Sequence, residues 1–181
     1  MALRALLENI PLFGLLLLAA AIDVRQRRIP NWLTAGMMLA GLSRAALIGG
    51  WSGLGHSAAG LFASAAAPFA LFALGALGGG DVKLLAGVGA WLGPSAGVAV
   101  FAVQCVIGLG LVLFQAMTQR RTILLFRNTA LLAATISQQG LAPVRDGGAG
   151  SFSTIDRPLP YAVPVALATC VVIFTPVLTT F

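Results

Sequence analysis

The sequence predicts an all-α polytopic membrane protein, a bundle of about six transmembrane helices joined by short loops. The 181 residues are 59% hydrophobic and 9% charged, with a mean hydropathy of +0.96. Several apolar windows approach the roughly 20 residues that a helix needs to cross the hydrocarbon core. The Lys and Arg residues gather in some of the connections between these windows, a bias typical of cytoplasmic loops.

Five apolar windows are clear candidates for spans: Leu6–Ile22, Trp32–Gly50, Ser57–Leu77, Ala96–Met117 and Leu159–Val177. The first is expected to be a retained helix, because no convincing signal-peptide cleavage site follows it. Small residues on every face of the third predict that other helices surround it. A sixth apolar segment, Val82–Leu92, is too short to span alone. It predicts a short helix, one that begins at the interface, or half of a broken span.

The basic residues predict the topology. Arg25, Arg27 and Arg28 follow the first window, and five more arginines lie between the last two windows. If these connections are cytoplasmic, six elements place the N-terminus and the C-terminus outside. The net charge of +6 then indicates topology and contact with anionic lipid headgroups, and no nucleic-acid partner is expected.

The connections leave room for one domain, residues 1–181. The outer ones, "IGGWSGLGH" after the second window and a turn at Gly93–Ser95, are too short to hold a folded unit. The inner connection, about 119–158, is predicted to combine an interfacial helix with a flexible loop. A seventh span around 122–136 is the alternative, and it would place the C-terminus inside.

Asp23 and Asp81 are acidic residues at the edges of apolar segments, where an ionisable group is costly and therefore predicts function. Asp23 closes the first window and Asp81 precedes the short segment, so the topology places both at cytoplasmic helix ends, where they could meet. Paired carboxylates can share one proton, one activating water while the other protonates the oxyanion. This is aspartyl proteolysis without a metal. The glycines Gly78, Gly79 and Gly80 would leave the approach open and allow a turn.

Each of these residues also has a structural explanation. Asp81 stands where a helix N-cap belongs, and Asp23 could be a solvated partner of the neighbouring arginines. Lys83 is expected to anchor the chain at the inner leaflet by snorkelling. His56 lies in the predicted outer loop, away from both aspartates.

Cys105 and Cys170 form neither a CxxC pair nor a zinc-binding set, so both are expected to be small buried hydrophobic residues.

Three motifs resemble those of the type IV prepilin peptidases, which are GxGD membrane aspartyl proteases. "GGGDVK" is similar to the GxGD signature with its GDxK extension, and "DVRQRRIPNWLT" to the family's first motif, an aspartate followed by a basic turn and Ile-Pro-Asn. "LPYAVPVAL" resembles the proline-aromatic motif of the last span. The resemblance implies Asp23 and Asp81 as the catalytic pair. The residues that would shape the site around them are Gly78, Gly79, Gly80, Lys83, Pro30, Asn31, Pro160 and Tyr161.

The resemblance implies a multi-pass peptidase of the bacterial inner membrane. It would cut the short basic leader from a type IV prepilin or pseudopilin at the cytoplasmic face. Its partners would be that substrate and membrane lipids, and no cofactor or metal is expected. Many relatives carry paired CxxC motifs, linked to N-methylation, in a large first loop. Here that loop is about nine residues, Asp23 to Asn31, and lacks such pairs, so no methyltransferase activity is expected. The small size resembles the CpaA/TadV branch, which processes Flp pilins.

The helix dipoles predict Asp81 as the resting base and Asp23 as the resting acid, since Asp23 ends one helix and Asp81 begins another. The main alternative function is a small proton- or cation-coupled transporter component that uses the same carboxylates. A structural subunit of a secretion assembly is a third reading, in which both aspartates tolerate Asn.

Overall fold

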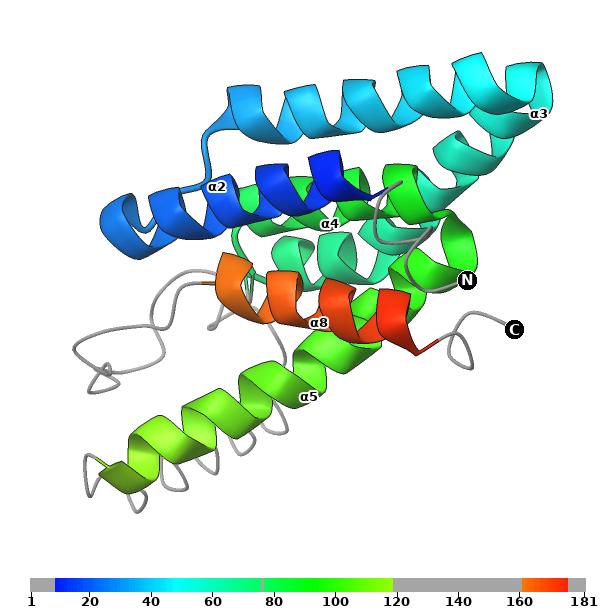
Figure 1. Cartoon of the computed structure of the whole chain (residues 1–181). Helices are drawn as coiled ribbons and strands as arrows, with labels where there is room; N and C mark the ends of the chain where they lie inside the picture. Colours follow the sequence, from blue (N-terminus) through cyan, green and yellow to red (C-terminus); the bar gives the residue numbers. More distant parts are fainter. Residues whose placement is uncertain (1–8, 76, 119–160, 176–181) are drawn as a thin grey trace.

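A computed structural model describes residues 9–75, 77–118 and 161–175, which form five helices (Figure 1). They are α2 (Ile10–Gln26), α3 (Asn31–Ala73), α4 (Gly79–Leu92), α5 (Pro94–Thr118) and α8 (Ala162–Phe174). These residues contain no strand, which confirms the predicted all-α class for this part of the chain. The interfacial helix, the loop and the alternative seventh span predicted at 119–158 lie outside the described residues.

Helix α3 folds back on itself at a single glycine (Figure 1). Gly50 has φ 58° and ψ −142°, a conformation that residues with a side chain rarely adopt. Close to this break, a Cβ added to Gly53 would overlap with the backbone carbonyl of Ala45, so the two arms nearly touch. The predicted outer loop at 48–56 is therefore wrong. A one-residue break lets both arms keep their helical hydrogen bonds up to the turn, which matters where no water is present to replace them.

The short helix α4 is the most enclosed element, lying against both arms of α3. Nine of its fourteen residues are buried. The expectation that other helices surround the third apolar window is wrong, because the buried residues in its described part occupy one face: Ser57, Gly60, Ser64 and Pro68. The side chain of Phe62 in the same arm is 72% exposed. The enclosed segment is thus the one that is too short to span.

Small residues allow α3, α4 and α5 to cross at near backbone contact. A Cβ added to Gly89 of α4 would overlap with the hydroxyl of Ser64 and the carbonyl of Gly60. A Cβ added to Gly97 of α5 would overlap with the same hydroxyl. Close backbone approach of this kind is typical of helix packing in membranes.

Two buried hydrogen bonds hold α4 between the arms of α3. Ser57 Oγ donates to the carbonyl of Ala90 at 2.6 Å, and Trp91 Nε1 donates to the carbonyl of Met37 at 2.9 Å. One bond reaches each arm of α3. The C-terminal turn of α4 is therefore fixed on both sides, and with it the register of the whole helix.

The remaining helices close the bundle. α8 packs beside both α2 and α5 (Figure 1). Among the described residues, α3 and the Pro94–Leu111 part of α5 are long and apolar enough to cross a membrane. Large apolar side chains such as Leu47, Trp51 and Phe114 are exposed, as lipid contact requires. The number of spans and the sides of the two termini stay predictions.

Candidate active site

Asp23 lies in α2 with its carboxylate buried in the bundle. It follows Leu12, Leu16 and Ala19 at helical spacing, so the four residues share the buried face of the helix. Asp23 is 6% exposed, and its Oδ2 accepts a hydrogen bond from the backbone N–H of Ala162 at 2.9 Å. The alternative of a solvated partner for the neighbouring arginines is therefore wrong.

Helix α2 continues for one turn beyond the predicted window, which ended at Ile22. Arg27 has a left-handed backbone (φ 51°, ψ 33°), and its N–H donates to the carbonyl of Asp23 at 2.8 Å. This conformation ends helices, usually at a glycine or asparagine. Asp23 is consequently held by regular helical geometry instead of lying in a loop, and only residues 27–30 connect α2 to α3.

Asp81 occupies the third position of α4 and is partly buried. Its Oδ2 accepts a hydrogen bond from the backbone N–H of Gly78, the N-cap residue, at 3.3 Å. The expectation that Asp81 is itself the N-cap is therefore wrong by three residues. A carboxylate at this position completes a capping arrangement and stabilises the positive end of the helix. Asp81 thus has a structural contribution beside any chemical one.

The glycines Gly78–Gly80 do not form the turn predicted for them. Gly78 is extended, with φ −80° and ψ 147°, and the next two residues are helical. The left-handed glycine in this connection is Gly75, with φ 76°. A Cβ on the second or third glycine of the triplet would come to 3.4 Å from Phe72 or from Ile29 respectively, which is ordinary contact. What the triplet provides is a surface without side chains next to Asp81.

A hydrogen bond connects the first turn of α4 to the first turn of α3. Lys83 Nζ donates to Oδ1 of Asn31 at 2.9 Å. Pro30 is the N-cap residue of α3, and its carbonyl accepts the N–H of Leu33 at 3.1 Å. Lys83 is exposed, as a snorkelling lysine would be, but its ammonium group is held by Asn31. The first two motifs of the sequence therefore meet in space.

This contact brings the two aspartates to the same end of the bundle. Gly80 packs against Ile29, which follows α2, so the first turn of α4 lies beside the end of α2. The arrangement provides two carboxylates from different helices, as a diacid mechanism requires. Their catalytic role stays a prediction.

Tyr161 joins the site from the third motif. It immediately precedes Ala162, whose N–H binds Asp23, and its phenol O–H donates to Oε1 of Gln104 at 3.0 Å. Gln104 lies in α5 and is 5% exposed. Gln104 is not among the predicted site residues, although an amide inside an apolar window is a signal that could have found it. Pro160 lies outside the described residues.

Two helix ends act on the carboxylate of Asp23. Asp23 lies near the negative end of α2, but α8 begins at Ala162 and directs its N-terminal amide at the same carboxylate. Asp81 likewise lies in the first turn of α4. Both carboxylates thus face the N-terminus of a helix, so helix dipoles do not distinguish the acid from the base.

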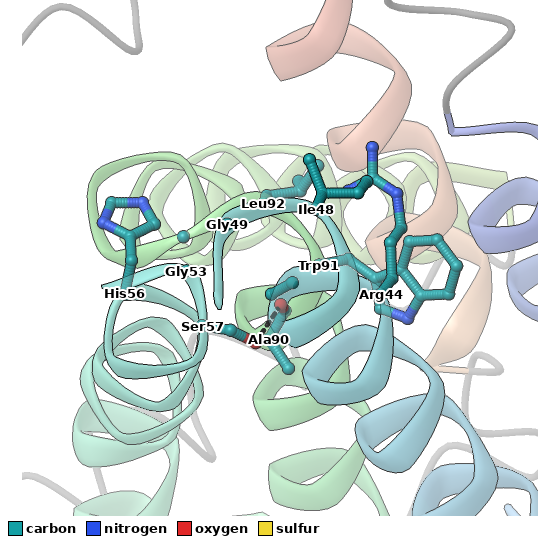
Figure 2. Close-up of a pocket in the computed structure, with 11 residues that line it drawn as sticks. Arg44, Ile48, Gly49, Gly53, His56, Ser57, Ala90, Trp91 and Leu92 are labelled. Carbon is teal, nitrogen blue, oxygen red and sulfur yellow. Dashed lines mark hydrogen bonds between the residues drawn. The ribbon is translucent and has the colours of Figure 1, made fainter. Parts of the chain in front are cut away.

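A cavity of about 210 Å³ lies at the opposite end of α4, against the α3 turn (Figure 2). The guanidinium of Arg44 stands 5.7 Å from the ring centre of Trp91, and His56 and Ser57 also line the cavity. His56 is in α3 and not in a loop. With α4 between them, at about 1.5 Å of rise per residue, His56 and Asp81 are well separated, and the expectation that His56 is not part of the site agrees with the structure.

Both cysteines are free, and neither is fully buried. Cys105 is exposed on α5 and Cys170 is intermediate on α8. The expectation of two buried cysteines is therefore wrong, because the outer faces of these helices are themselves apolar. Within the described residues, no three His, Cys, Asp or Glu side chains are grouped to hold a metal ion.

Comparison with known proteins decides the family. The type IV leader peptidase family model matches residues 10–113, more than half of the chain. The chain belongs to the type IV leader peptidase family. The matched range contains Asp23, Asp81 and Gln104 and ends before Tyr161. No curated protein and no solved structure matches the chain.

Membership in the type IV leader peptidase family makes this protein a peptidase, and therefore a hydrolase. Together with the apolar helices, it indicates a membrane protein. The family predicted from the three motifs is thus confirmed. The CpaA/TadV branch stays a prediction.

Proposed function

We propose that this protein is a membrane-embedded aspartyl endopeptidase that removes the short basic leader from type IV prepilins of the Flp type. The observation that carries the proposal is the placement of Asp23 and Asp81. They come from different helices and lie at one end of the bundle, because Gly80, the residue before Asp81, packs against Ile29 just beyond the end of α2. When two carboxylates from these positions come close together, they favour a state in which the pair holds one proton, and that state provides a base and an acid together.

The proposed reaction needs only these two side chains and water. One carboxylate takes a proton from water while the water oxygen attacks the scissile carbonyl carbon. The other, protonated carboxyl donates its proton to the carbonyl oxygen. The tetrahedral intermediate then collapses, the C–N bond breaks, and the leaving nitrogen receives the proton that the first carboxylate took from water. The hydroxyl returns a proton to the second carboxylate as the new carboxyl group forms, so the pair again holds one proton.

Positions beside the aspartates suit an extended substrate. The glycines Gly78–Gly80 present no side chains next to Asp81, so a substrate backbone can approach closely. Lys83 and Asn31 border the same region from α4 and α3. We propose that these residues, with Pro30, Pro160 and Tyr161, shape the site.

We further propose that the protein lacks N-methyltransferase activity and resembles the CpaA/TadV branch. Only residues 27–30 separate α2 from α3. The chain contains two cysteines, Cys105 and Cys170, so it has no CxxC motif in this connection. The short connection leaves no room for an inserted unit, which supports a peptidase without the second activity.

The proposed location is the bacterial inner membrane, with the aspartates at the cytoplasmic face and both termini outside. Arg25, Arg27, Arg28 and Lys83 lie at the same end of the bundle as Asp23 and Asp81. Positive charge of this kind is typical of the cytoplasmic side. The substrate leader would then be cut before or during export, on the side where it is made.

The test is cleavage of a prepilin from the same genome by the purified protein in detergent, with the new N-terminus read by mass spectrometry. Wild type is expected to cut at the end of the basic leader. Asp146→Asn, a substitution outside the described residues, is the matched control and should retain activity. Intact precursor with wild type would contradict the peptidase proposal. Loss of ion transport in both Asp23→Asn and Asp81→Asn, with no change in precursor length, would favour the transporter alternative.

A further inference from the structure

We infer that Gln104 is a positioning residue of the peptidase site, which holds the Tyr161 phenol at the aspartate end of the bundle with its hydroxyl hydrogen turned away from the substrate. The inference rests on the proposed function and assigns a new residue to it. Gln104 would act through Tyr161, without touching the scissile bond.

The first support is the environment of Gln104. It is the one residue from Ala96 to Leu113 whose side chain carries an amide, a hydroxyl or a charge. An amide in such surroundings is costly unless it is hydrogen-bonded. Gln104 is 5% exposed, and its Oε1 accepts the phenol hydrogen of Tyr161 at 3.0 Å. An apolar side chain would suit this helix better, so a polar partner is the simplest reason for the amide.

The second support is the position of Tyr161. The next residue, Ala162, donates its N–H to the Asp23 carboxylate at 2.9 Å. Tyr161 is therefore one residue away from the amide that binds Asp23, at the end of the bundle where Asp81 also lies. The orientation of its hydroxyl group matters at such a place, because a phenol O–H is a good donor to a carboxylate.

The hydrogen bond to Gln104 settles that orientation. A phenol has one hydrogen, and here it is committed to an amide oxygen on α5. It is consequently not available to Asp81, which stays free to exchange protons with water and substrate. The phenol oxygen keeps its lone pairs and can accept a hydrogen bond from a main-chain N–H. The phenol oxygen of Tyr161 therefore suits a ligand that offers main-chain N–H groups, such as an extended peptide backbone.

A double-mutant cycle on prepilin cleavage separates positioning from packing. The four proteins are wild type, Gln104→Met, Tyr161→Phe and the double variant, each assayed for kcat and KM after its melting temperature has been measured. Methionine matches glutamine in length and is unbranched, so it fills the same space. If Gln104→Met does not fold, Gln104→Leu takes its place. Thr169→Val is the matched control, because its buried hydroxyl bonds to Val165 of its own helix.

Gln104→Met and Tyr161→Phe should each lower kcat/KM about fivefold, the size expected for one neutral hydrogen bond. The double variant should be no slower than Tyr161→Phe alone, since without the hydroxyl Gln104 has nothing to position. Losses that multiply, or unchanged cleavage by Gln104→Met, would overturn the inference and leave the peptidase intact. Absence of cleavage by wild type would instead overturn the proposed function, and the inference with it.

Discussion

Truncating Asp23 should destabilise the protein as well as inactivate it, because its carboxylate accepts the first amide of α8. Asp23→Ala leaves the Ala162 N–H, buried beside α2, without that partner. Hydrogen bonds to charged groups contribute about 1.5–3 kcal/mol, and an unsatisfied buried donor costs a similar amount. For a chain of this length, 1 kcal/mol corresponds to roughly 2–4 °C in melting temperature. Asp23→Ala should therefore melt about 3–12 °C below wild type.

Asp23→Asn is the matched control for this prediction. The amide keeps an oxygen that can accept from Ala162, so most of the stability should remain while the ionisable group is lost. Thermal unfolding in detergent, followed by circular dichroism, compares the three proteins, and cleavage of the precursor is measured in parallel. Both variants should be inactive, but only Asp23→Ala should melt markedly earlier. Equal melting temperatures for wild type and Asp23→Ala would refute the claim that Asp23 holds α8.

Two further predictions concern packing and the edge of the site. Gly89→Ala should lower the free energy of unfolding by about 1–3 kcal/mol, because its Cβ would overlap with a backbone carbonyl of α3. Gly108→Ala, with open space around it, should be neutral or stabilising by up to about 1 kcal/mol. Equal melting temperatures would exclude the close crossing. Lys83→Met should lower cleavage severalfold while the melting temperature changes by no more than about 2 °C, since the bond to Asn31 is exposed. A large loss of stability would instead make Lys83 a structural residue.

The sequence predicts the helical class and the approximate elements well, because a membrane helix is recognisable as a long run of apolar residues. The errors occur where backbone geometry decides. A nine-residue connection rich in glycine indicated a loop, yet one break at Gly50 is enough, since helix on both sides keeps backbone groups paired. Composition also suggested that the third window is the enclosed element. Which helix is enclosed depends on the packing of all of them, and here it is the short α4.

The candidate site was likewise predicted only in part from the sequence. Aspartates at the edges of apolar segments are rare enough for sequence to single out Asp23 and Asp81. Their partners could not be predicted, because the Ala162 amide is 139 residues from Asp23 and the Tyr161 phenol is 57 residues from Gln104. The same separation explains why helix dipoles could not assign the acid and the base from sequence. The relevant helix end at Asp23 includes α8, whose first amide binds its carboxylate.

The central claim is that Asp23 and Asp81 act as one catalytic unit. The most direct measurement is kcat/KM for prepilin cleavage by wild type, Asp23→Asn, Asp81→Asn and the double variant, all shown to be folded. Each single variant should lose at least about a thousandfold, and the double variant should be no worse than either, because residues that act as a unit are not additive. Near wild-type cleavage by Asp23→Asn or by Asp81→Asn would contradict the account.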